Sequence, residues 1–119
     1  MRTGSVTPPL TDDRDDPELN IIDPDDNMQM SYLVLSEEER ARGFVRPVRT
    51  SYVHVPCGAV TTMSEPIAET YARDPHFYGG TYCARCQNHF PVGPAPRGEF
   101  VWSVPREGTP LGETDKVGT

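Results

Sequence analysis

Two short motifs of the sequence give the strongest indication of its fold. They are His54-Val55-Pro56-Cys57-Gly58 and Cys83-Ala84-Arg85-Cys86. In each motif, two residues separate two potential metal ligands. This spacing lets both side chains meet one metal ion while backbone N–H groups turn toward the first donor atom. One nitrogen and three sulfurs complete a tetrahedral shell and leave no position open for water. The sequence therefore predicts one structural zinc ion held by His54, Cys57, Cys83 and Cys86.

The fourth ligand has an alternative, because His89 also lies at ligand spacing after Cys86. His54 is favoured, since Gly58 completes the first motif while the second motif already has both of its ligands. Two hypotheses without a metal stay open. Cys83 and Cys86 would form a redox dithiol, although this requires a helix N-terminus to lower a thiol pKa. Otherwise the three cysteines are unconnected buried thiols.

The composition limits the size and class of the protein. A chain of 119 residues has room for one core, and 13 prolines, 10 glycines and 35% hydrophobic residues leave few long regular elements. The longest apolar run, Tyr32 to Leu35, is far shorter than the roughly 20 residues of a membrane-spanning helix. No apolar segment of a secretory signal begins the sequence. We expect no membrane association and a cytoplasmic location.

The formal charge of -7 is unevenly distributed. Residues 1–36 hold eight acidic residues against Arg2 and Arg14, whereas nine basic residues face seven acidic ones from Arg40 onward. Low hydrophobicity and high charge are typical of segments that do not fold alone. We therefore expect an acidic, proline-rich arm over residues 1–35 that is disordered or ordered by a partner. A core over 36–106 and a flexible tail over 107–119 follow.

Local patterns in the core predict an α+β fold. A serine followed three residues later by glutamate is a capping box, and Ser36 and Glu39 have this spacing. Alternating β-branched and aromatic residues predict strands, and an apolar stripe predicts a helix capped by Ser64. The expected elements are helices over 37–42 and 65–73 and strands over 51–55, 59–63 and 99–103. We thus expect a small zinc-ribbon-like β-hairpin core with one or two short helices and a long irregular acidic arm.

Aromatic residues flank both motifs. We expect them to pack around the metal-bound hairpins rather than to form a surface that stacks on nucleobases. The residues concerned are Tyr52, Phe77, Tyr78, Tyr82, Phe90, Phe100 and Trp102.

The region from Ser36 to Val104 resembles a small zinc-ribbon-like family of bacteriophage and prophage proteins. The resemblance rests on the runs Ala41 to Arg49, Tyr52 to Gly58, Thr61 to Met63 and Ile67 to Pro75, with Phe77-Tyr78-Gly79 and the Cys83/Cys86 pair. It implies a metal site and a phage-encoded protein, in the host cytoplasm or associated with the virion. The insertion Gly93 to Gly98 and the acidic arm depart from the family pattern.

Three classes of function fit these features. The first is a non-enzymatic interaction protein whose zinc core presents a rigid surface and whose acidic arm binds a host protein or a phage assembly. The second is a nucleic-acid-binding zinc ribbon that uses Arg40, Arg42, Arg46 and Arg49. The third is an enzyme with a zinc-bound water. The closed ligand set and the lack of the His-x-Glu motif of zinc deaminases disfavour the enzyme.

Overall fold

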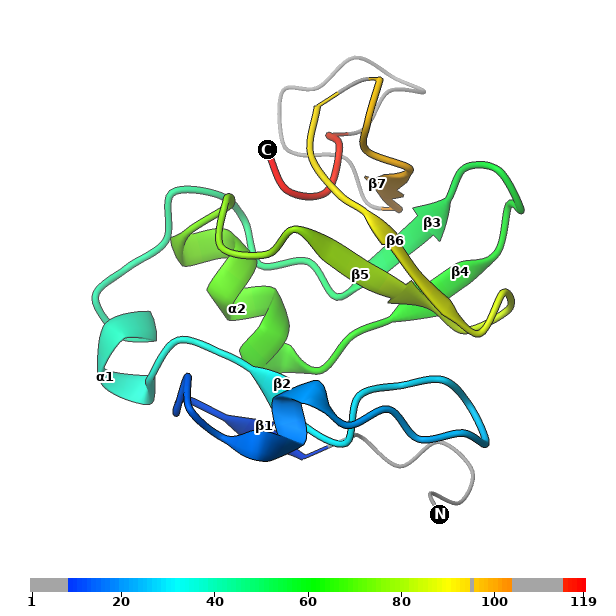
Figure 1. Cartoon of the computed structure of the whole chain (residues 1–119). Coiled ribbons are helices and arrows are strands. Elements are labelled where there is room, and N and C mark those ends of the chain that lie inside the picture. Colours follow the sequence, from blue (N-terminus) through cyan, green and yellow to red (C-terminus); the bar gives the residue numbers. More distant parts are fainter. Residues whose placement is uncertain (1–8, 95, 104–114) are drawn as a thin grey trace.

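The structure is a computed structural model of the chain and describes residues 9–94, 96–103 and 115–119. Figure 1 shows a mixed α+β fold of short elements joined by long loops. Within the described residues there are two α-helices, α1 (Glu37–Arg40) and α2 (Glu65–Arg73), a 3-10 helix (Pro17–Asn20), and seven strands: β1 (Leu10–Thr11), β2 (Tyr32–Leu33), β3 (Ser51–His54), β4 (Val60–Thr62), β5 (Gly80–Cys83), β6 (Asn88–Pro91) and β7 (Phe100–Trp102). The α+β class is confirmed.

The central sheet is antiparallel, in the order β4-β3-β7. Its register places Tyr52 opposite both Thr61 and Trp102. Because side chains alternate along a strand, Tyr52 and His54 face the core, where both are buried. The strands expected over 51–55, 59–63 and 99–103 are present, each one or two residues shorter than predicted.

The C-terminal residues cover the free edge of β7. The Trp102 N–H donates to the Asp115 carbonyl at 2.9 Å, and the Val117 N–H donates to the Phe100 carbonyl at 3.1 Å. Val117 has none of its surface exposed. Of the tail that the sequence predicts to be flexible, residues 107–114 lie outside the described residues, whereas 115–119 contact the sheet.

The β5–β6 hairpin forms a second sheet, which lies across the first in Figure 1. Neither strand of this hairpin was predicted from the sequence. Apolar and aromatic side chains fill the space between the two sheets and α2. The buried core consists of Tyr52, Met63, Ala68, Tyr71, Cys83, Val92, Phe100, Trp102 and Val117, with Cys57, Ile67, Tyr78 and Phe90 packed against it. The predicted packing of aromatic residues around the hairpins is thus confirmed for most of them.

Helix α2 has the predicted bounds and buries Ala68, Tyr71 and Ala72 against the core. The predicted cap is only half right: Ser64 is the N-cap residue, but its hydroxyl makes no hydrogen bond within the described part of the chain. A cap hydroxyl accepts from the second or third helical N–H, and Pro66 at the second position has none. No helix in the described ranges is long and apolar enough to cross a bilayer.

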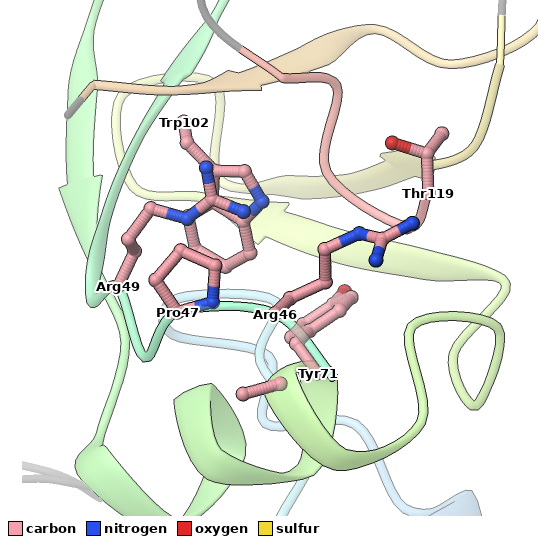
Figure 2. Close-up of a pocket in the computed structure, with 8 residues that line it drawn as sticks. Arg46, Pro47, Arg49, Tyr71, Trp102 and Thr119 are labelled. Carbon is pink, nitrogen blue, oxygen red and sulfur yellow. The ribbon is translucent and has the colours of Figure 1, made fainter. Parts of the chain in front are cut away.

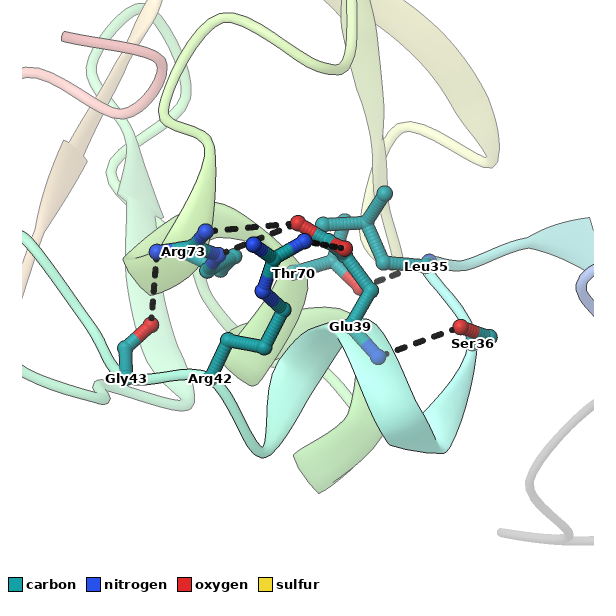
Figure 3. A network of polar contacts seen from close by, with 7 residues as sticks. All are labelled: Leu35, Ser36, Glu39, Arg42, Gly43, Thr70 and Arg73. Atoms are coloured by element: carbon teal, nitrogen blue, oxygen red, sulfur yellow. Dashed lines mark hydrogen bonds and ion pairs between the residues drawn. The ribbon is translucent and has the colours of Figure 1, made fainter.

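Helix α1 ends at Arg40, two residues before the expected end. Ser36 caps it by accepting the Glu39 N–H at 3.2 Å, as predicted. The Glu39 carboxylate instead binds Arg42 at 3.2 Å and Arg73 of α2 at 3.3 Å, which Figure 3 shows as one network. The hydrogen bond from Arg42 is the main reason that the Glu39 pKa lies below its usual value. The two helices are therefore joined by charge rather than by apolar packing.

Residues 9–35, the described part of the acidic arm, lie against the core. The parallel pair β1–β2 is anchored by the Tyr78 hydroxyl, which donates to the Leu33 carbonyl at 2.6 Å. The Leu35 N–H donates to the Thr70 hydroxyl oxygen at 3.2 Å, and Thr70 is fully buried. That a partner orders the arm stays a prediction.

Replacing Thr70 by Val keeps the shape of the side chain but leaves the Leu35 N–H without its acceptor. We expect Thr70→Val to lower the free energy of unfolding by about 1–3 kcal/mol, the usual cost of an unsatisfied polar group. Urea denaturation followed by Trp102 fluorescence measures this change. Thr62→Val, at an exposed position, is the matched control and should change stability by less than about 0.5 kcal/mol. Equal effects of the two substitutions would contradict this role for Thr70.

Candidate metal centre

Each half of the metal centre follows a strand that ends at its first ligand. His54 ends β3 and Cys57 lies in the turn toward β4, while Cys83 ends β5 and Cys86 lies in the turn toward β6. The chain reverses in both turns with backbone bonds to the first ligand: the Gly58 N–H donates to the His54 carbonyl at 2.7 Å, and the Gln87 N–H donates to the Cys83 carbonyl at 2.8 Å. Two hairpins from different sheets thus present their tips to each other.

The four donor atoms are close enough to bind one ion. They all lie within 4.8 Å of one another. His54 Nδ1 is 3.3 Å from Cys57 Sγ and 3.6 Å from Cys86 Sγ, and the Sγ atoms of Cys57 and Cys83 are 3.6 Å apart. Tetrahedral zinc with bonds of about 2.3 Å to sulfur and about 2.0–2.1 Å to nitrogen requires separations of about 3.8 Å between sulfurs and about 3.5 Å between sulfur and nitrogen. The donor set and its spacing fit a tetrahedral metal ion.

The His54 ring is held in one orientation. Its Nε2 atom lies 2.8 Å from a carboxylate oxygen of Glu99. Since a carboxylate accepts, Nε2 carries the proton and Nδ1 directs its lone pair at the sulfurs. Phe90 of β6 stacks on one side with ring centroids 4.3 Å apart, and the Phe100 centroid of β7 is 4.8 Å away. The imidazole is therefore positioned as a ligand by residues from both sheets.

The thiol groups differ in acidity. Burial alone raises the Cys83 pKa, but N–H groups of Cys86 and Arg85 and the Cys57 thiol donate to its sulfur and lower the pKa to about 7. Burial and the neighbouring sulfurs of Cys83 and Cys57 raise the Cys86 pKa to about 11. Crowded thiols resist multiple ionisation unless a cation is present. The cluster therefore suits a divalent ion that binds thiolates.

Both turns place their fifth residue in the left-handed region. Gly58 has a φ of 76°, which costs glycine little, and an added Cβ would meet no atom within 4 Å. Gln87 occupies the equivalent place in the second turn with a φ of 53°. Its carbonyl accepts from the side-chain amide of Asn27 at 3.0 Å, which links the second turn to the acidic arm. The two turns have the same backbone geometry, although only the first has the glycine.

His89 is not in the cluster. Its Nε2 atom lies 2.8 Å from the Tyr32 hydroxyl, and burial lowers its pKa. The structure thus places His54, rather than His89, with the three sulfurs. It also places all three cysteines together, contrary to the hypothesis of unconnected thiols. Cys86 leads into β6 rather than into a helix, so the helix N-terminus that a redox dithiol requires is missing here.

The four arginines of the possible nucleic-acid site do not form one free basic surface. Arg40 pairs with Glu69, Arg42 pairs with Glu39, and Arg49 pairs with Asp115 at 3.0 Å. Figure 2 shows Arg49 against the Trp102 ring, with the guanidinium carbon 5.0 Å from the ring centroid. Arg46 donates to the carbonyl of Val45. Three of these four side chains are used in ion pairs within the fold.

No protein-family model, curated protein or solved structure matches this chain. Glu99 was not predicted as part of the site, and Phe90 was expected to pack around the hairpins but not to stack on the His54 ring. No spacing signal identifies them, since Glu99 lies 45 residues from His54 and Phe90 belongs to the unpredicted strand β6.

Removing the Glu99 carboxylate should weaken metal binding without removing a ligand. We expect Glu99→Ala to lower the zinc affinity by about 10–100-fold, the usual effect of losing the group that orients a metal-bound histidine. Glu99→Gln should lose less, because its amide oxygen still accepts from Nε2. Competition with a chromophoric chelator gives the affinities, and Glu65→Ala, exposed on α2, is the control. An unchanged affinity in Glu99→Ala would contradict this role.

The left-handed turn positions give a paired stability test. Gln87→Gly should raise the free energy of unfolding by up to about 1 kcal/mol, because glycine adopts this conformation without a steric penalty. Gly58→Ala should lower it by about 1–2 kcal/mol for the same reason. Urea denaturation of the metal-loaded variants measures both changes. The same sign for the two substitutions would show that the turns are not equivalent.

Proposed function

We propose that this chain is a non-enzymatic interaction protein whose core is held together by one structural zinc ion. The observation that carries the proposal is the closed set of donors His54, Cys57, Cys83 and Cys86 on two hairpin tips. Thiolates with one imidazole in a tetrahedral set are typical of structural zinc rather than of calcium or magnesium, which prefer oxygen. When bound, the ion supplies folding free energy by joining the two hairpins. Four protein ligands leave no position for a catalytic water.

The surface of the acidic arm supports a protein partner. Asp12, Asp13, Asp15 and Asp25 are exposed, and Ile21 and Ile22 are 49% and 45% exposed within the same arm. Carboxylates beside apolar side chains are suited to a basic partner surface with apolar contacts. The ion pairs of Arg40 and Arg49 speak against the nucleic-acid alternative, since these two side chains are only 17% and 5% exposed. A phage origin, and thus a host protein or a phage assembly as partner, rests on the resemblance of residues 36–104.

The metal assignment is tested by elemental mass spectrometry of the native protein. We expect about one zinc per chain in the wild type and a loss of zinc in His54→Ala and Cys83→Ala, because each removes a ligand. His89→Ala is the matched control and should keep its zinc, since His89 binds Tyr32 instead. Wild-type protein without bound zinc would overturn the assignment.

The role of the arm is tested by neutralising its charges without deleting its contacts. Asp12, Asp13, Asp15 and Asp25 are replaced together by Asn, which keeps the side-chain oxygen that accepts the Asp15 N–H at Asp13. Affinity purification from the host, quantified by mass spectrometry, should show partner capture reduced by at least about tenfold. Glu37 and Glu38→Gln, on exposed positions of α1, form the control. Equal capture by both variants would reject the arm as the binding element.

A further inference from the structure

The hydrogen-bond pattern leaves one edge of the central sheet unpaired. In an antiparallel sheet, successive residues direct their backbone groups to opposite sides. The bonds from the His54 N–H to the Ala59 carbonyl and from the Met63 N–H to the Thr50 carbonyl show which pairs join β3 to β4. By this alternation Thr61 bonds to Tyr52, so Val60 and Thr62 direct their N–H and carbonyl groups away from β3. Neither residue has a backbone partner on that side within 9–94, 96–103 and 115–119.

The outer sides of β7, β5 and β6 make at least some hydrogen bonds to neighbouring segments. Residues 115–117 pair with the outer side of β7. On the second sheet, the Tyr82 carbonyl of β5 accepts from the Tyr52 hydroxyl, and the Pro91 carbonyl of β6 accepts from the Glu99 N–H at 3.0 Å. Pro91 has no N–H to leave unpaired. Among β4, β5, β6 and β7, β4 is thus the strand whose outward-facing residues both lack a hydrogen-bond partner within the described residues.

The edge of β4 is short, at three residues, but it carries no charged residue and no proline. Open edges are typically protected by charged residues, proline or a bulge, or by a covering segment. The sequence of β4 is Val60-Thr61-Thr62, and Val60 is 60% exposed. Its side chain lies on the outer face of the sheet, where Val53 and Val101 are half-buried and Val55 is exposed. The edge therefore continues into a β-branched face that is also uncharged at these positions.

We infer that β4 pairs with β4 of a second copy of this chain to form a two-fold symmetric dimer. The edge is complementary to itself. When the two-fold axis passes through Thr61 of an antiparallel pair, Val60 of each copy lies opposite Thr62 of the other copy. Each of these pairs exchanges both N–H···O bonds, so every free group of the edge finds a partner. A symmetric interface of this kind closes on itself and stops at two chains. This inference goes beyond the proposed function and does not depend on a protein partner.

Sedimentation velocity from about 1 µM to about 1 mM protein tests the dimer, a range that covers interfaces at the weak end of the affinity scale. The wild type should shift with concentration from 13.2 kDa toward twice that mass. Thr62→Pro removes an outward N–H that the fold does not use, and Val60→Lys places a charge at the edge; each should raise the dissociation constant at least about tenfold. Val45→Lys, at a position 57% exposed outside the sheet, is the matched control and should dimerise like the wild type.

Hydrogen exchange gives a second readout that locates the interface. The amide protons of Val60 and Thr62 should exchange slowly at high protein concentration and rapidly on dilution, while that of Thr61 stays protected at both. Zinc content and the near-ultraviolet circular dichroism of Trp102 verify that each variant is folded. A wild type that remains monomeric over the whole range overturns the inference. So does a dimer that both edge variants form as readily as the wild type.

Discussion

The rest of the structure depends on one constraint, the meeting of four donor atoms from two hairpins that belong to different sheets. His54 and Cys57 come from the β3–β4 hairpin, and Cys83 and Cys86 come from β5–β6. The sheets are small, with strands of two to four residues, so hydrogen bonding within them gives little independent stability. A metal ion held by the four residues would add bonds that cross between the two sheets. The core then forms around this junction, with Cys83 fully buried in it.

The orientation of His54 shows how the fold supports the cluster from outside the ligand set. Glu99 fixes which nitrogen carries the proton, and Phe90 and Phe100 enclose the ring. These three residues come from β6, from β7 and from the residue before β7. Both sheets therefore contribute residues that support the candidate metal centre, and for this reason these residues are far apart in the sequence.

The acidic arm and helix α1 are attached to the rest of the fold by polar contacts. Ion pairs and hydrogen bonds there add to the stability that the small apolar core provides. Glu39 joins α1 to α2 through Arg73 and also pairs with Arg42 just after α1. Two hydrogen bonds attach the arm to the core. The Tyr78 hydroxyl donates to the Leu33 carbonyl, and the Leu35 N–H donates to the Thr70 hydroxyl oxygen. Four of the arm's carboxylates, those of Asp12, Asp13, Asp15 and Asp25, remain exposed on the surface, whereas Asp23 is buried.

From the sequence alone the three cysteine donors, the bounds of α2, the Ser36 cap and most of the central sheet could be predicted, because these depend on spacing and on local backbone preference. Neither β5 nor β6 was predicted. Asn88-His89-Phe90-Pro91 has weak strand character and is held by pairing with β5. Only the tertiary structure decided between His54 and His89, paired the arginines with Glu39, Glu69 and Asp115, and placed Glu99 on the imidazole. Such contacts join residues far apart in the chain, and no local pattern encodes which of them will meet.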